Sequence, residues 1–112
     1  AALENTFFSS LYSPDDTSDL NKDFVAEYKK AYNTNPDVFA ALAYDSTLLV
    51  AKAIEDAGSA DPAKIAEAMA KIKGFKGVSG EVTFNEQHNP IKSAVIIEHK
   101  DGKQTFKTKV NP

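Results

Sequence analysis

The sequence predicts a small mixed α/β domain with three helices, several short strands and a C-terminal β-hairpin. Apolar residues recur at helical spacing over the first two thirds of the chain. The last third instead has short runs of β-branched and aromatic residues, two of which flank an Asp-Gly pair. With 112 residues, the chain is long enough for one domain with a modest core.

The first strand and the first helix are expected near the start of the chain. Residues 6–11 have the aromatic and β-branched content of a short strand. A helix is expected over residues 19–32, where one side carries an apolar residue at every fourth position: Leu20, Phe24, Tyr28 and Tyr32. Pro36 limits this helix, because proline disfavours helical geometry at the residue before it.

A long second helix is expected over residues 38–57, and a third begins at Pro62. Asp37 is suited to cap the second helix, because its carboxylate can accept hydrogen bonds from N–H groups of the first turn. Gly58 is suited to the left-handed residue that follows it. The second helix is apolar nearly all round, which predicts that it is covered on more than one side. We expect Gly74 to close the third helix.

The final part of the chain is predicted to be strand. Residues 81–84 form a short strand pattern and residues 85–90 a polar turn. Residues 93–100 and 103–110 flank the Asp-Gly pair, which is a strong hairpin signal because a type I′ turn requires positive φ at both central residues.

The two-residue turn also predicts the pairing of the last two strands. Ile97 is expected to face Phe106, and Val95 to face Thr108. The other face of the last strand would then carry Lys103, Thr105, Lys107 and Lys109. Lysines at alternate positions are typical of a solvated edge strand.

Composition restricts the class of function. The net charge is −3, which argues against a nucleic-acid partner, since such binding needs clustered cations. There is no cysteine, so thiolate chemistry and disulfides are excluded. No apolar run approaches the length of a membrane-spanning helix. The chain begins with Ala and shows no signal peptide, and we expect it to be processed or excised from something longer.

No pattern for catalysis or metal binding is complete. A calcium loop starting at Asp15 would need glycine and a carboxylate where Leu20 and Ala26 stand. Residues 77–80 fall short of a nucleophile elbow, because Glu81 takes the place of the last glycine. Neither of the two histidines has a partner at ligand spacing. We therefore expect no enzyme activity, no catalytic residue, no metal site and no cofactor.

Four segments carry a more specific signal. They are PDVFAALAYDS at 36–46, AIEDAGSADP at 53–62, FKGVSGEVTFN at 75–85, and NPIKSAVII at 89–97 followed by DGK at 101–103. In this order they resemble the C-terminal portion of the substrate-binding protein of a branched-chain amino acid ABC transporter. That protein is of the type I periplasmic binding protein family, so the predicted fold is a part of that α/β fold.

The resemblance implies two lobes with the ligand in the cleft between them, which closes by a hinge motion. Residues 1–84, including the strand that enters it, would belong to the lobe shared with a missing N-terminal portion. Residues 85–92 would form a hinge crossover, and residues 93–112 the hairpin of the second lobe.

The resemblance also implies a function and a site. The chain would be a fragment of an extracytoplasmic receptor, periplasmic or lipid-anchored at the outer face of the cell membrane. The receptor would bind an amino acid-like small molecule and deliver it to an ABC permease. Phe39 matches a position that packs on ligand in some relatives, and Tyr44 and Asp45 are further candidates. Core packing is the alternative for Phe39 and Tyr44, and contact with the interlobe framework is the alternative for Asp45.

Two other functions compete with this one. The chain could be a ligand-sensing domain of a receptor or regulator on the same fold, or a standalone α/β interaction domain. A transmembrane or signalling domain in the parent protein would favour the sensing domain. We also expect self-association through residues 38–57, with the hairpin at 93–110 as a further contact, because the apolar second helix must leave water.

Overall fold

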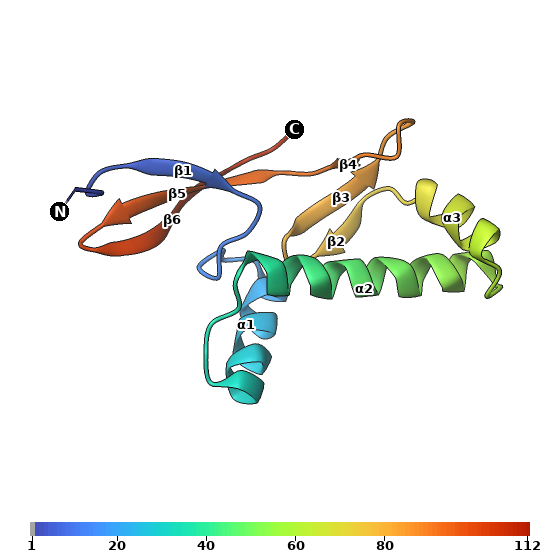
Figure 1. Cartoon of the computed structure of the whole chain (residues 1–112), viewed down its shortest axis with the longest axis horizontal. Helices are drawn as coiled ribbons and strands as arrows, with labels where there is room; N and C mark the ends of the chain where they lie inside the picture. Colours follow the sequence, from blue (N-terminus) through green and yellow to red (C-terminus); the bar gives the residue numbers. More distant parts are fainter. Residues whose placement is uncertain (1) are drawn as a thin grey trace.

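Two bodies, joined by short crossovers, make up the computed structural model, which describes residues 2–112 (Figure 1). The helical body contains residues 12–91, and the sheet body contains the strands that precede and follow them. The radius of gyration is 16.1 Å, against about 13 Å for a compact chain of this length. The bodies therefore lie side by side along the long axis instead of merging around one core.

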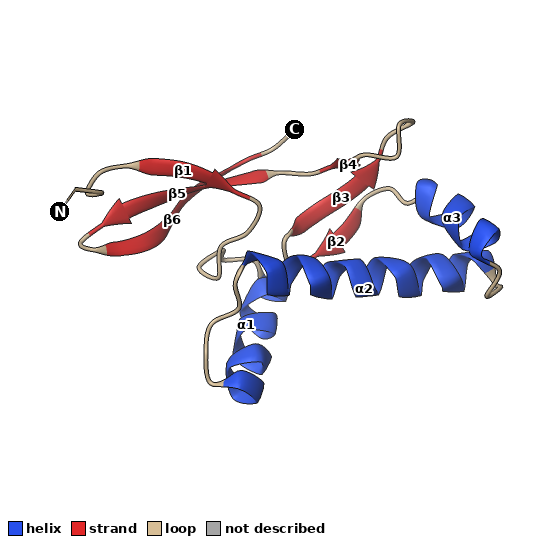
Figure 2. Ribbon diagram, in the orientation of Figure 1, coloured by secondary structure: helices blue, strands red, loops and turns tan. Residues whose placement is uncertain are grey.

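Three helices form most of the helical body: α1 (Asp19–Tyr32), α2 (Val38–Ala57) and α3 (Pro62–Ala70) (Figure 2). The predicted bounds of the first two are confirmed. Asp37 caps α2, since its Oδ1 atom accepts a hydrogen bond from the Ala40 N–H at 2.8 Å. Gly58 follows α2 with a φ of 57°, the left-handed conformation that glycine adopts without steric cost.

The third helix ends at Ala70, four residues before the predicted Gly74. Its last turn tightens, because the N–H groups of Lys71 and Ile72 bond to carbonyls three residues back. The chain then leaves the helix direction, and the Ile72 carbonyl accepts from the Phe84 N–H at 3.2 Å. Packing of Ile72 under the strands thus ends the helix early.

A three-stranded sheet completes the helical body: β2 (Phe75–Gly77), β3 (Gly80–Phe84) and β4 (Pro90–Ile91). Both neighbouring pairs are antiparallel. The strand β3 and the polar turn after it agree with the prediction. The strand β2 was not predicted, because three residues that end on a glycine show no period; its pairing with β3 creates it.

The core of the helical body lies between α2, α3 and this sheet. Its buried members are Leu49, Ala53, Ile72 and Val82. A second, smaller cluster joins the segment before α1 to the start of α2, and consists of Tyr12, Ala41 and Val78 with Phe24 and Val38 packed against them. The core is therefore divided in two, and each part is small.

The sheet body has three strands, β1 (Phe7–Ser10), β5 (Ala94–Lys100) and β6 (Lys103–Val110), in the order β1-β5-β6. The strand β1 pairs antiparallel with β5, so it lies with the hairpin and not with the helices. The predicted turn is confirmed, because Asp101 and Gly102 have φ values of 51° and 72°.

A β-bulge changes the predicted register of the hairpin. Ile97 faces Phe106 as expected, but the register shifts at the next residue. Val95 consequently pairs with Lys109, and the predicted pairing with Thr108 is wrong. Because paired residues share a face of the sheet, the extra residue moves Lys109 from the solvated face to the face of the buried Val95.

Replacing Ile72 by Ala should lower the free energy of unfolding by about 2–5 kcal/mol, since the loss of a buried side chain leaves a cavity. Ile72 is 3% exposed, whereas Ile91 is 42% exposed, and Ile91→Ala should cost less than about 1 kcal/mol. Urea denaturation followed by circular dichroism measures both. Equal losses would contradict this position of the core.

Candidate functional site

The first turn of α2 lies at the surface and carries Phe39. This side chain is 77% exposed, so core packing does not describe it. Helix N-termini favour anions through the helix dipole, and the carboxylate of Asp37 supplies a negative charge there. The turn thus presents an uncovered aromatic ring next to a helix end that is already capped.

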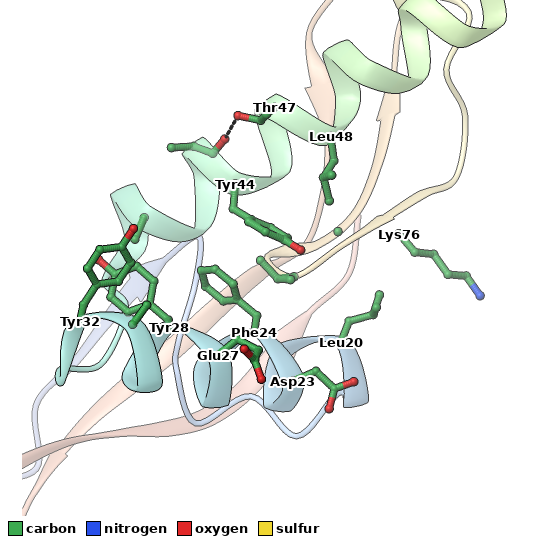
Figure 3. A pocket seen from close by; sticks show the side chains of 15 residues that line it. Leu20, Asp23, Phe24, Glu27, Tyr28, Tyr32, Tyr44, Thr47, Leu48 and Lys76 are labelled. Atoms are coloured by element: carbon green, nitrogen blue, oxygen red, sulfur yellow. Dashed lines mark hydrogen bonds between the residues drawn. The ribbon is translucent and has the colours of Figure 1, made fainter.

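Tyr44 lies in an open groove of about 700 Å³ between α1 and α2 (Figure 3). Its ring centroid is 4.8 Å from that of Phe24. Along α1, neighbouring centroids in a ladder of three rings are 5.7 Å and 4.6 Å apart; the rings are those of Phe24, Tyr28 and Tyr32. The aromatic stripe predicted from its spacing therefore lines an open groove and not a closed core.

Asp45 projects from another side of α2 and is 3% exposed. Its Oδ1 atom accepts from the Val78 N–H at 2.7 Å, and its Oδ2 atom accepts from the N–H and the hydroxyl of Ser79 at 2.8 and 2.5 Å. Val78 and Ser79 form the turn between β2 and β3. Three donors compensate the loss of hydration that burial of a carboxylate entails.

The close contact between Asp45 and this turn requires glycine at position 77. A Cβ atom on Gly77 would lie 2.5 Å from Oδ2 of Asp45, well inside van der Waals contact. Any side chain at this position would displace the carboxylate or the turn. The role of Gly77 is therefore to allow close approach of the turn to α2.

The Ser79 hydroxyl connects Asp45 to Lys92. The Nζ atom of Lys92 donates to Oγ of Ser79 at 2.6 Å, and the hydroxyl donates to Asp45. Burial lowers the pKa of the Lys92 ammonium group, although the Asp45 carboxylate opposes this shift. A hydrogen-bonded chain of an aspartate, a serine and a lysine resembles a nucleophilic site. Ser79 is only 5% exposed, however, so a substrate does not reach its hydroxyl.

A second buried carboxylate, Asp16, lies in the loop before α1. Its Oδ2 atom is 2.5 Å from Nζ of Lys109 on β6, and its Oδ1 atom accepts from the Ser18 N–H at 2.9 Å. Burial acts to raise the pKa of Asp16, but Lys109 and Ser18 together outweigh it and hold that pKa below its usual range. Burial, followed by the charge of Asp16, raises the pKa of the Tyr12 phenol.

The three predicted site residues do not come together. Phe39 faces solvent, Tyr44 faces the groove and Asp45 faces the β2–β3 turn. The residues that do converge are Asp45, Ser79 and Lys92, and the last two were not predicted. Ser79 is 34 positions from Asp45 in the sequence, and Lys92 is 13 positions from Ser79. Local spacing therefore carried no signal beyond the glycines around Ser79.

Across residues 2–112, none of the helices is long and apolar enough to cross a membrane. Within the same range, no three His, Asp or Glu side chains are grouped as metal ligands. The buried carboxylates of Asp16 and Asp45 already have donors, and the exposed apolar side chains include the rings of Phe39 and Tyr44. An uncovered aromatic ring, together with carboxylates that already have donors, is compatible with a binding module.

The comparison with known families agrees with this class. The profile of a family described as periplasmic binding protein matches residues 1–104. The chain therefore belongs to the periplasmic binding protein family, whose members bind ligands and are not enzymes.

Several relatives have known names or structures. A leucine-, isoleucine-, valine-, threonine- and alanine-binding protein of Pseudomonas aeruginosa is 36% identical over 76% of this chain. A leucine binding protein from Thermotoga maritima shares the fold with a TM-score of 0.87, at 38% identity over 99% of this chain. A third relative is a branched-chain amino acid transporter substrate binding protein from Streptococcus pneumoniae, which was solved with isoleucine. Its TM-score is 0.84, at 37% identity over 97% of this chain.

The chain is much shorter than these relatives. It spans 23% of the Pseudomonas protein and 32% and 31% of the Thermotoga and Streptococcus chains. The matched part of the fold is thus about one third of a complete binding protein.

Replacing Asp45 by Ala should lower the free energy of unfolding by about 2–4 kcal/mol, because it leaves buried donors of Val78 and Ser79 without an acceptor. Asp56→Ala is the matched control on α2, since that carboxylate forms an exposed pair with Lys52, which is worth less than about 1 kcal/mol. Thermal and urea unfolding would compare them. A loss in Asp45→Ala no greater than in the control would contradict the role of this contact.

Proposed function

We propose that this chain is part of an extracytoplasmic solute receptor that binds an amino acid-like ligand between two lobes and delivers it to an ABC importer. The observation that carries this proposal is the agreement of nearly the whole chain with the leucine binding protein from Thermotoga maritima. Membership of the family leaves no support for a standalone domain whose resemblance is accidental.

The ligand class follows from what the relatives bind. One structural relative was solved with isoleucine. Another, a solute binding protein from Rhodopseudomonas palustris, was solved with benzoate. It is 27% identical, with a TM-score of 0.82, and the match covers 99% of this chain and 31% of that chain. Both ligands combine an apolar body with a carboxylate. We propose a ligand of that kind, and an exposed aromatic ring on a helix is suited to cover its apolar body.

Phe39 is the residue of this chain that best suits such a contact, because its ring is uncovered while the rest of the first turn is capped. Tyr44 is engaged with Phe24, and the carboxylate of Asp45 already has three donors. We propose that Phe39 contacts the ligand and that Tyr44 and Asp45 support the helix that carries it.

The same proposal assigns the bodies to lobes. The helical body would belong to the lobe shared with the rest of the receptor, and the hairpin would belong to the second lobe. The predicted hinge crossover at residues 85–92 would then lead through β4 to the passage between the bodies at residues 92–93. The receptor would lie in the periplasm or be lipid-anchored at the outer face of the cell membrane, with an ABC permease as its partner.

A chimera tests the proposal. Residues 2–112 would replace the matching third of the Thermotoga leucine binding protein, and calorimetry would measure leucine binding. We expect binding, and we expect Phe39→Ala to weaken it about tenfold or more, because a ring that covers the ligand is worth at least about 1.4 kcal/mol. Phe7→Ala is the control, since Phe7 lies on β1 in the sheet body.

Two outcomes would contradict the proposal. One is a folded chimera, with native circular dichroism, that binds no leucine, isoleucine or benzoate. The other is an equal loss in Phe39→Ala and in the control, which would remove the assigned role of Phe39. The separate 112-residue chain should give no saturable heat with these ligands, because one wall of the cleft is absent and binding sites bury most of the ligand surface.

We also propose that the chain self-associates through α2. Five large apolar side chains of this helix are at least 40% exposed: Phe39, Tyr44, Leu48, Val50 and Ile54. Large apolar side chains left exposed on one helix indicate an interaction site. Here the contact would be with a second copy, and the hairpin could contribute to it as in domain swapping.

Sedimentation equilibrium at several concentrations measures this association. We expect a dimer or larger assembly, and Leu48→Lys should weaken it at least tenfold by placing a charge in an apolar contact. Lys22→Glu on the exposed face of α1 is a control for altered charge. A chain that sediments as a 12.1 kDa monomer at all concentrations would overturn the proposal.

A further inference from the structure

The helical body and the sheet body have little packing between them. In the helical body, extensive contacts join α2 to α3 and β3 to its neighbours β2 and β4. In the sheet body, they join β5 to its neighbours β1 and β6. The chain passes between the bodies at Leu11 and at residues 92–93, and both crossovers are short. Two short connections without a shared core do not by themselves fix the angle between the bodies.

Two lysine side chains contact the helical body at this junction, one from the sheet body and one from the crossover. Lys109 of β6 reaches the buried Asp16 of the helical body, with 2.5 Å between Nζ and Oδ2. Lys92 lies on the second crossover, and its Nζ atom donates to the Ser79 hydroxyl at 2.6 Å. Ser79 in turn donates to the buried Asp45. Each lysine thus ends at a buried carboxylate of the helical body, one directly and one through a hydroxyl.

The register of β6 is adapted to this contact. Without the bulge, Lys109 would lie on the opposite face of the sheet, as the two-residue turn alone predicts. With it, Lys109 pairs with Val95, and its side chain is 30% exposed while that of Asp16 is 10% exposed. An ion pair with one buried member is screened by water and salt less than an exposed pair is.

We infer that Lys92 and Lys109, the interbody lysines, fix the angle between the helical body and the sheet body. The crossovers hold the bodies near each other, and the two lysine contacts select one orientation. Removing both lysines leaves the fold of each body intact and frees the angle. This inference concerns the chain itself and does not rest on the proposed ligand.

Pulsed electron paramagnetic resonance tests the inference. Because the chain has no cysteine, Lys64→Cys on α3 and Gln104→Cys on β6 place one spin label on each body. Labelled chain is diluted into unlabelled chain, so that only distances within one chain are measured. We expect one narrow distance distribution in the parent, and a distribution at least twice as wide when Lys92→Met and Lys109→Met are combined.

Lys107→Met is the matched control, because Lys107 lies on the same strand and pairs with Glu98 within the sheet body. Its distribution should keep the width of the parent. Should the double variant lose its helical circular dichroism, Ser79→Ala serves instead, since it removes only the hydroxyl between Lys92 and Asp45 and should also widen the distribution. A broad parent distribution, an unchanged width in the folded double variant or in Ser79→Ala, or equal widening in the control would overturn the inference.

Discussion

The buried carboxylate of Asp45 is the interaction on which the arrangement of the helical body depends. A helix and a hairpin turn meet there without a side chain between them, since Gly77 has no Cβ atom. An ionised carboxylate is costly to bury, and the donors of Val78 and Ser79 compensate that cost only in one geometry. The contact therefore fixes the position of the β2–β3 turn relative to α2, and with it the path of the chain toward the second crossover.

The remaining packing is too limited to make the chain one compact domain. Its two hydrophobic clusters are small and separate, and much of the apolar surface of α2 is uncovered. In a chain that spans about one third of its structural relatives, such a surface is what a part of a larger fold presents. The same surface explains why we propose that an isolated copy associates with itself.

The division into two bodies relates the structure to the proposed receptor. A ligand cleft between lobes requires bodies that can change their relative orientation, and short crossovers permit this. The interbody lysines act against that freedom, because each ends at a buried carboxylate. The junction thus combines two short covalent connections with electrostatic contacts that favour one orientation, and Phe39 lies on the helix that one of these contacts supports.

The sequence by itself determined the local structure and the family. The bounds of α1 and α2, the cap at Asp37 and the turn at Asp101 and Gly102 follow from side-chain chemistry within a few residues, and the ordered motifs resembled the family that the comparisons then showed. Only the tertiary structure decided the early end of α3, the strand β2 and the bulge that redirects Lys109. It also decided that Asp45 is buried and that Phe39 is exposed. These features depend on contacts between residues far apart in the chain, and no local periodicity encodes which distant group will supply the missing partner.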